Sequence, residues 1–222
     1  MLTINFIMRL FLFLLSAGFF VTSCNNASDK TAATFCDTAC ASDSFIFKGD
    51  HKLKPFVTIS VKNCTGDTIT WSHDALPVGR QMHLGTMLDN LVRLNKSAIT
   101  CFIKDTSYAW VSFNDCISGR GYLMQLPFNK KESVRKMSSA INSFDKKFVV
   151  PDDLRAYCDY STIYIEDINT GQKELMTFKE EYKIDFNNIH EAIDTVNISR
   201  NRIFIQLLKD GKKIPLEKTI SL

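Results

Sequence analysis

The stretch Ala109-Trp110-Val111-Ser112-Phe113, with the polar run Asp115-Cys116-Ile117-Ser118-Gly119 behind it, decides the fold of this chain. β-branched and aromatic residues alternate along the first run, a turn sequence ends in glycine, and a second apolar run begins at Leu123. Period-two alternation on both sides of a glycine-bearing turn is typical of a β-hairpin. We therefore expect two antiparallel strands joined close to Ile117.

The same pattern occurs four times along the chain. The other three copies are Phe56–Val61 with a turn at 63–66, Thr162–Ile165 with a turn at 167–171, and Arg202–Leu207 with a turn at 209–211. The turn glycines at positions 66, 119, 171 and 211 are 53, 52 and 40 residues apart. The likeness is greatest between Asp115–Gly119 and Asp167–Gly171, which are each followed by a Leu-Met pair and then a Phe. These copies predict a mainly β body of antiparallel hairpins.

The spacing falls near the period of β-propeller blades, about 40 to 50 residues, and the strand-turn-strand copies resemble such blades. The resemblance implies one β-rich domain over residues 45–222, arranged as a small propeller. A β-sandwich also explains the hairpins, because any antiparallel protein repeats them. The sequence leaves these two arrangements open.

Two segments carry the helical period instead. One steps by three and four residues through an apolar set: Val134, Met137, Ile141, Phe144 and Phe148. Asn129 and Glu132 are placed to cap this helix, and Pro151 to end it. A second helix is expected near residues 82–94, where apolar residues share one face: Leu84, Met87, Leu88 and Leu91. We expect both helices to be inserted between strands.

The first 24 residues have the pattern of an export signal. Arg9 precedes an apolar run, Leu10–Phe20, which is too short to cross a bilayer because a spanning helix takes about 20 apolar residues. The run closes on Val21-Thr22-Ser23-Cys24, which resembles the lipobox of bacterial lipoproteins. The resemblance implies cleavage before Cys24, a diacylglycerol on its thiol, and a further acyl chain such as palmitate on the new amino terminus. Several acyl chains hold a protein on a membrane stably.

A small polar tether follows. Asn25–Thr34 has almost nothing to bury, so residues 1–23 are assigned to the signal peptide and 24–44 to the lipidated cysteine and a flexible tether. The Asn-rich tether and the run Asp37–Ala39 resemble lipoproteins of the Bacteroidota. Asn rather than Asp at position 25 resembles lipoproteins that are sorted to the outer membrane. These resemblances imply a cell-envelope protein on the outer membrane, with the periplasmic or surface face left open.

The charge balance argues against one class of partner. Without residues 1–23 the chain carries 26 basic and 24 acidic side chains, because that segment contains Arg9 and no acidic residue. No basic stripe is present in the sequence to neutralise the phosphates of a nucleic acid. We therefore expect no nucleic-acid partner.

Six cysteines remain besides Cys24, an even number that favours disulfides in an exported protein: Cys36, Cys40, Cys64, Cys101, Cys116 and Cys158. The sequence does not choose among their possible pairings, although Cys36-x-x-x-Cys40 could close a small loop. Redox or structural metal chemistry typically uses Cys-x-x-Cys pairs, and the sequence has none.

Catalytic and cofactor signatures are absent from the sequence. It contains no Gly-x-Ser-x-Gly elbow, no phosphate-binding Gly-x-x-x-x-Gly-Lys and no Gly-x-Gly-x-x-Gly, so we expect no cofactor. His73, Asp74 and His83, near Trp71, are candidates for a metal site, but their spacing matches no ligand pattern and we expect no metal there. Acidic pairs such as Asp152-Asp153 could serve glycoside hydrolysis, which needs two carboxylates across a cleft.

The anchor and the missing catalytic motifs together favour one function. We expect a lipid-anchored envelope protein whose β-rich domain is a binding or scaffolding module for a protein or glycan ligand. The alternative is an envelope hydrolase that acts on glycans, with carboxylates assembled from distant loops.

Replacing the lipobox cysteine tests the anchor. We expect Cys24→Ser to release a soluble form or to leave an uncleaved precursor, because the thiol that receives the lipid is gone. Immunoblots of membrane and soluble fractions measure this. Normal processing of the variant, with retention in the membrane fraction, would contradict the lipoprotein interpretation.

Overall fold

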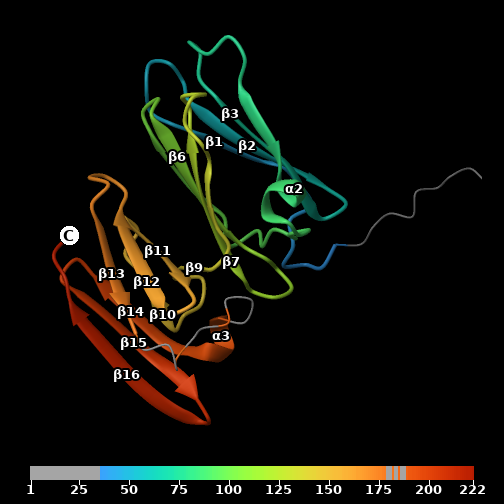
Figure 1. Cartoon of the computed structure of the whole chain (residues 1–222). Helices are drawn as coiled ribbons and strands as arrows, with labels where there is room; N and C mark the ends of the chain where they lie inside the picture. The colour runs from blue at the N-terminus through green and yellow to red at the C-terminus, as the bar shows by residue number, and fades with distance from the viewer. Residues whose placement is uncertain (1–35, 179–181, 183–184, 186–188) are drawn as a thin grey trace, which may run out of the picture. The chain divides into compact units, whose positions relative to one another are not determined.

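The computed structural model describes residues 36–178, 182, 185 and 189–222 (Figure 1). Cys36–Leu222 forms one compact unit, which consists mainly of antiparallel β-structure in four four-stranded sheets. The prediction of a mainly β body made of hairpin repeats is confirmed. No helix in the described part of the chain is long and apolar enough to cross a membrane.

Each sheet is described in its spatial order. The first contains β1 (Phe45–Lys48), β2 (Phe56–Lys62), β3 (Thr65–Ser72) and β4 (Arg80–His83). The second contains β5 (Thr100–Lys104), β6 (Tyr108–Asn114), β7 (Gly121–Pro127) and β8 (Arg135–Met137). The third contains β13 (Lys173–Thr177), β12 (Thr162–Asp167), β11 (Leu154–Asp159) and β9 (Ala140–Ile141). The fourth contains β10 (Phe148–Val149), β14 (Ile193–Ser199), β15 (Arg202–Lys209) and β16 (Lys212–Thr219), with β10 parallel to β14. The described residues also include two short helices, α2 (Leu84–Leu88) and α3 (Ile189–Ala192).

The four sequence copies correspond to the four sheets. Each copy supplies a central strand, β2, β6, β12 or β15, and the turn that joins this strand to the next. In the second, third and fourth sheets the residue after the third strand then donates its N–H to the carbonyl of the first turn: Phe128 to Ser107, Phe178 to Ser161 and Ile220 to Asn201. One supersecondary unit is therefore repeated, as the spacing of the glycines predicts.

The two most similar turns fold alike. Asp115 Oδ1 accepts the N–H groups of Ile117 and Ser118, at 3.1 and 2.8 Å. Asp167 Oδ1 accepts those of Asn169 and Thr170, at 2.7 and 2.9 Å. Gly119 and Gly171 close the turns at φ of +73° and +77°, a region that favours glycine because it has no Cβ. The Asp-x-x-Ser/Thr-Gly likeness thus has a local hydrogen-bonding cause.

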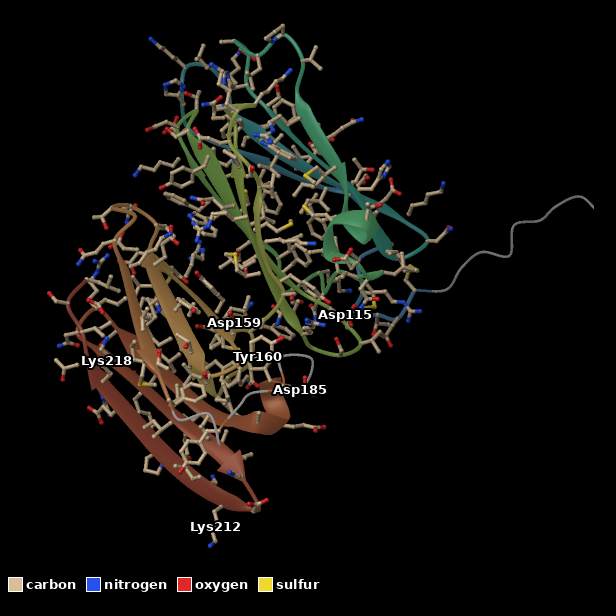
Figure 2. All side chains as sticks on the ribbon, in the orientation of Figure 1. Asp115, Asp159, Tyr160, Asp185, Lys212 and Lys218 are labelled. Atoms are coloured by element: carbon tan, nitrogen blue, oxygen red, sulfur yellow. A yellow bond between two sulfur atoms is a disulfide. The ribbon has the colours of Figure 1, made fainter. Side chains whose placement is uncertain are left out.

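The second sheet is buried on both faces. On one face, Val111, Phe113 and Met124 join a core with Ile69 and Trp71 of the first sheet. The opposite face contributes Trp110 and Leu123 to a smaller cluster with residues of the third sheet and the loops beside it: Ala140, Tyr157 and Ile168. Side chains from the facing sheets lie in both spaces (Figure 2). Burial on two faces is why β6 and β7 are almost continuously apolar in sequence.

The third and fourth sheets share a core of their own. Ala156, Ile163 and Ile165 pack against Val196 and Ile205, with Phe148 of β10 in the same cluster. The outer strand β16 alternates between exposed and half-buried residues. Among the described residues, no hydrophobic cluster contains members of both the first and the fourth sheet. In the described residues the packing is therefore that of consecutive layered sheets, and the four sheets do not form a closed barrel.

The helix expected between Asn129 and Pro151 is wrong. The segment contains β8, β9 and β10, and Met137 pairs with Leu123 on the edge of the second sheet. Asn129 forms a turn instead of a cap, since its Oδ1 accepts the N–H of Lys131 at 3.0 Å. The 3-and-4 spacing of the apolar residues is accidental, because backbone pairing along β7 overrides a weak helical preference.

The second expected helix is present in shortened form. α2 covers Leu84–Leu88 rather than residues 82–94, and its Leu84 and Met87 face the first core. Asp89 ends it in the left-handed region at φ of +54°, which satisfies the geometry of a helix stop without glycine. The short α3, Ile189–Ala192, was not expected.

Four of the six body cysteines form disulfides. Cys36 bonds to Cys64 and Cys40 bonds to Cys116, with Cα–Cα distances of 5.5 and 5.4 Å. The small loop between Cys36 and Cys40 is therefore not closed by a bond between these two residues. Residues 36–40, which the sequence analysis assigns to the tether, are held on the body by these bonds. The remaining two cysteines are free: Cys101 and Cys158.

Gly121 provides a test of how closely the second and third sheets approach. A Cβ at this position would lie 2.4 Å from the backbone oxygen of Ala140, which cannot rotate away. We expect Gly121→Ala to lower the free energy of unfolding by about 1–3 kcal/mol, the usual cost of overpacking, as measured by urea denaturation. Gly85→Ala is the control, because its Cβ meets only Leu91 Cδ2 at 3.4 Å, and Asn90 O at 3.9 Å, on a short helix. Equal stability of Gly121→Ala and the natural protein would contradict the close approach.

Candidate ligand-binding cavity

A cavity of about 240 Å³ lies between strands of the second and third sheets. The second sheet contributes Thr100, Ser112 and Leu123, and the third contributes β9 and β11. The segments before β5 and around β10 complete the lining: Ser97, Ala98, Asn142, Ser143, Phe144, Val150, Pro151 and Asp152. Side chains from distant parts of the sequence therefore meet here because two repeats pack face to face.

The lining combines apolar and polar groups. Leu123, Ile141 and Leu154 are buried, whereas Phe144 is 41% exposed. The hydroxyls of Ser97 and Thr100 make no hydrogen bond within the part of the chain that the structure describes. Apolar walls with a few free polar groups are typical of small-molecule sites.

Asn142 fixes the polar side of the cavity. Its Nδ2 donates to Asn114 Oδ1 at 2.7 Å, and its Oδ1 accepts the N–H of Phe144 at 3.2 Å. The carbonyl oxygen of Val150 accepts the Ser143 hydroxyl at 3.0 Å, and the Val150 N–H returns a bond to that hydroxyl at 3.1 Å. These bonds tie the loop between β9 and β10 to β6 and to Val150 at the cavity wall.

Arg155 is the charged residue of greatest interest in the lining. Its Nη1 donates to the backbone oxygens of Asp152 and Leu154, at 2.7 and 2.8 Å. Its Nε is buried without a hydrogen-bond partner. Among the described residues, no Asp or Glu forms an ion pair with Arg155. Burial lowers the pKa of Arg155, and the nearby charge of Asp152 opposes this shift.

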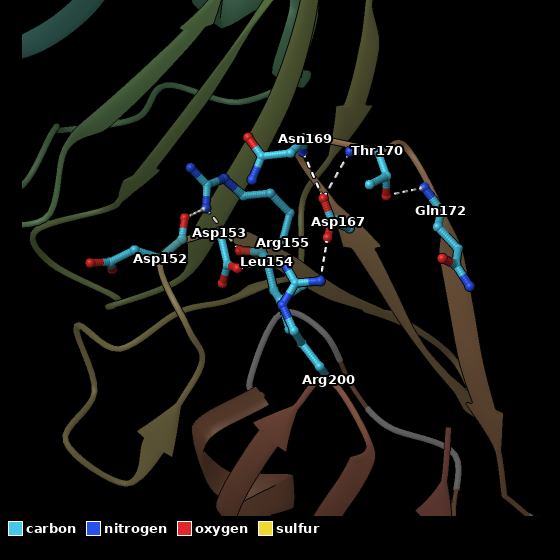
Figure 3. A network of polar contacts seen from close by, with 9 residues as sticks. All are labelled: Asp152, Asp153, Leu154, Arg155, Asp167, Asn169, Thr170, Gln172 and Arg200. Carbon is cyan, nitrogen blue, oxygen red and sulfur yellow. Dashed lines mark hydrogen bonds and ion pairs between the residues drawn. The ribbon is translucent and has the colours of Figure 1, made fainter. Parts of the chain in front are cut away.

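A network beside the cavity holds residues 152–155 in place (Figure 3). The guanidinium of Arg200 lies 2.5 Å from Asp153 Oδ2 and 2.6 Å from Asp167 Oδ2. The N–H of Ile168 also donates to Asp153 O at 3.0 Å. Asp167, in the repeated turn, is thereby tied to the strand that carries Arg155. The repeated turn serves as a fixed support for one wall of the cavity.

The carboxylates at the cavity do not form a catalytic pair. Asp152 is the one acidic residue of the lining, and it is exposed. Asp153 is engaged by Arg200 instead. Glycoside hydrolysis needs two carboxyl groups about 5 to 10 Å apart across the substrate. The cavity lining therefore lacks the arrangement that this chemistry requires.

The histidines singled out in the sequence do not meet. His83 pairs with Thr68, five positions before His73, so the two histidines lie roughly 17 Å apart at about 3.3 Å per residue. His73 Nδ1 accepts the N–H of Ala75 at 3.3 Å, and Asp74 lies 3.8 Å from Lys54 Nζ. No group of three or more His, Cys, Asp or Glu in the described ranges could hold a metal ion. Instead, His83 borders a separate hollow with Met82, Met87 and Lys136.

The free cysteines have little nucleophilic character. Burial raises the pKa of both Cys101 and Cys158 to about 12, so both stay protonated at neutral pH. Cys24 lies outside the described residues. The large aromatic residues Trp71, Trp110 and Tyr122 are in the cores and present no stacking face.

Arg155 is not among the site residues predicted from the sequence. The signal was present in Leu154-Arg155-Ala156-Tyr157-Cys158, where a charged residue occupies one position of an apolar strand whose neighbours are buried. A charge inside such a strand needs a partner or water. Two backbone oxygens close in sequence, those of Asp152 and Leu154, are its partners, and a sequence does not show that no anion is paired with it.

Comparisons with known proteins give little further information. No protein-family model matches the chain, and no curated protein matches it. One solved structure, described as "AfRom2 CNH domain", shows 8% sequence identity and a TM-score of 0.27. The match covers 80% of this chain and 64% of that one. A similarity this low supports no inference about function.

The Asp167 network predicts a pH dependence of stability. The N–H of Thr170 is the main cause that lowers the pKa of Asp167 below its ordinary value of 3.8, and Arg200 adds to the effect. A carboxylate with a lowered pKa in the folded state stabilises it above the ordinary pKa, and this stability is lost as the pH falls through the folded-state value. We expect the free energy of unfolding to decline below about pH 3.8.

Asp167→Asn tests this assignment. At neutral pH the free energy of unfolding of the variant should be lower by about 1–3 kcal/mol, because the buried charge that accepts hydrogen bonds and pairs with Arg200 is removed. Its decline in stability at low pH should also be shallower than that of the natural protein, as measured by urea denaturation over a series of pH values. Parallel pH profiles of the two proteins would show that Asp167 is not responsible.

Proposed function

We propose that this chain is a lipid-anchored cell-envelope protein whose β-rich body binds a small ligand in the cavity between the second and third sheets. The cavity is the observation on which the proposal rests. It is lined by residues of two packed sheets, and it presents free hydroxyls and a charged group beside apolar walls. Such a lining favours binding of a molecule with both polar and apolar parts.

The rigidity of the walls supports a preformed site. β6 and β7 are packed on both faces, and β11 is supported by the core of the third and fourth sheets. A preformed site loses little conformational entropy when the ligand enters, so affinity is retained. At about 240 Å³ the cavity is below the usual range of roughly 300–1,000 Å³, which favours a ligand the size of one sugar ring or one amino acid.

Binding is favoured over hydrolysis. The rival function, an envelope hydrolase acting on glycans, needs a second carboxylate opposite Asp152, and the cavity lining contains none. A glycan end or a small metabolite therefore fits the site as a ligand to be held.

The lipid anchor is proposed from the sequence alone, because Val21–Cys24 resembles a lipobox. The disulfides support an anchored arrangement, because Cys36 and Cys40 attach the beginning of the described chain covalently to residues of the body. Force on an anchored amino terminus would be passed to Cys64 and Cys116. An outer-membrane location remains part of this proposal.

A cavity-filling variant tests the binding function. Ala98 lines the cavity and is 8% exposed, so Ala98→Leu should fill part of it. The matched control is Ala75→Leu, the same change at an exposed position. The full chain, purified in detergent, is titrated by ligand-observed NMR with neutral and acidic monosaccharides and short carboxylic acids.

We expect at least one probe to bind the natural chain. A ligand of about 12 non-hydrogen atoms at about 0.3 kcal/mol per atom binds with about 3.6 kcal/mol, which gives a Kd of about 2 mM. Ala98→Leu should weaken this binding at least tenfold, whereas Ala75→Leu should not change it. If none of the probes binds, or if Ala98→Leu binds as well as the natural chain, the proposed site is wrong.

A further inference from the structure

We propose that the cavity selects a small monocarboxylic acid, such as a uronic acid, by pairing its carboxylate with Arg155. This inference rests on the proposed function and adds the chemical class of the ligand.

The guanidinium of Arg155 is partly buried, and its hydrogen bonding is incomplete. Two backbone carbonyls accept hydrogen bonds from Nη1, and in the described part of the chain neither Nε nor Nη2 has a partner. Removing a guanidinium from water is costly unless an anion compensates it. Arg135 and Arg200 have such anions, with Glu166 at 3.0 Å and Asp167 at 2.6 Å.

The orientation of the Arg155 guanidinium leaves one donor for a ligand. Figure 3 shows Nη1 turned toward the two carbonyls, with the opposite side of the guanidinium turned away from them. Because the carbonyls occupy Nη1, the Nη2 donor is left for an incoming oxygen. A charge-assisted N–H···O bond of this kind is shorter and stronger than a neutral one. The hydroxyls of Ser97 and Thr100, on the same lining, can donate to the remaining oxygens.

The charges of the lining favour a ligand with a single negative charge. The lining holds one cation, Arg155, and one exposed carboxylate, Asp152. Asp153 is nearby but is paired with Arg200. Because the charges of Arg155 and Asp152 already balance, a bound monoanion adds one negative charge beside Asp152 and a dianion adds two. The balance therefore favours a carboxylate over a phosphate dianion.

The apolar part of the lining fits the carbon skeleton of an organic acid. Phe144 is 41% exposed at the cavity, and Leu123 and Ile141 are buried in its lining. An aromatic face beside aliphatic walls offers contact for the C–H faces of a sugar ring or for a short carbon skeleton. The lining thus fits an acid that has an organic body and disfavours a bare inorganic anion.

The test compares three probes on the full chain in detergent: galacturonate, galactose and inorganic phosphate. Galacturonate and galactose differ in a carboxylate against a neutral hydroxymethyl group on the same ring. We expect galacturonate to bind at least tenfold more tightly than galactose, and phosphate to bind more weakly than galacturonate. This comparison needs no variant, so it does not depend on whether any substitution folds.

Variants then assign the effect to one residue. Arg155→Met removes the charge at similar length and should reduce galacturonate binding to the galactose level. Arg155→Lys keeps the charge and should retain part of the preference. Arg93→Met is the matched control at an exposed arginine and should leave all affinities unchanged.

The outcomes separate this inference from the proposed function. Equal affinity for galacturonate and galactose, with both lost in Ala98→Leu, would overturn the carboxylate inference and leave the cavity as a binding site. Tighter binding of phosphate than of galacturonate would also overturn it. If folded Arg155→Met keeps the full preference for galacturonate, the acid is held by another residue and the inference is wrong. Absence of binding by every probe of the larger panel would remove the proposed function itself.

Discussion

Burial of the second sheet on both faces is the constraint on which the rest of this structure depends. β6 and β7 pack against the first sheet through Val111 and Met124, and against the third through Trp110 and Leu123. Because a sheet covered on both sides cannot shift without breaking two cores, it fixes the spacing of its neighbours. Gly121 shows how close that spacing is, since even one methyl group at this position would meet the Ala140 carbonyl.

Local features of the fold could be predicted from the sequence, and non-local ones could not. The hairpins and the turns at Asp115 and Asp167 were predictable, because alternation and Asp-x-x-Ser/Thr-Gly act over a few residues. The helix expected through Met137 and Ile141 was wrong, since pairing with β7 is a contact between strands that periodicity does not contain. The disulfide partners of Cys36 and Cys40 could not be predicted either, because the bonded cysteines are 28 and 76 residues apart in sequence.

The candidate site belongs to the non-local class. Thr100, Asn142 and Arg155 come from three separate segments and meet only because two repeats pack together. His73, Asp74 and His83 stood out as candidates in the sequence, yet the register of β3 and β4 keeps His83 away from the other two. Arg155 drew no attention because its significance depends on missing partners, which a sequence does not list. The repeated turn at Asp167, by contrast, could be recognised in the sequence, and in the structure it supports the site through Arg200.

A crystal structure of the chain grown with galacturonate tests the central claim most directly, since it shows both the cavity and the state of Arg155. The account predicts electron density for the sugar acid between the second and third sheets, with a carboxylate oxygen within hydrogen-bonding distance of Arg155 Nη2. A cavity that contains only water, with the guanidinium of Arg155 paired to the Asp152 carboxylate, would contradict it.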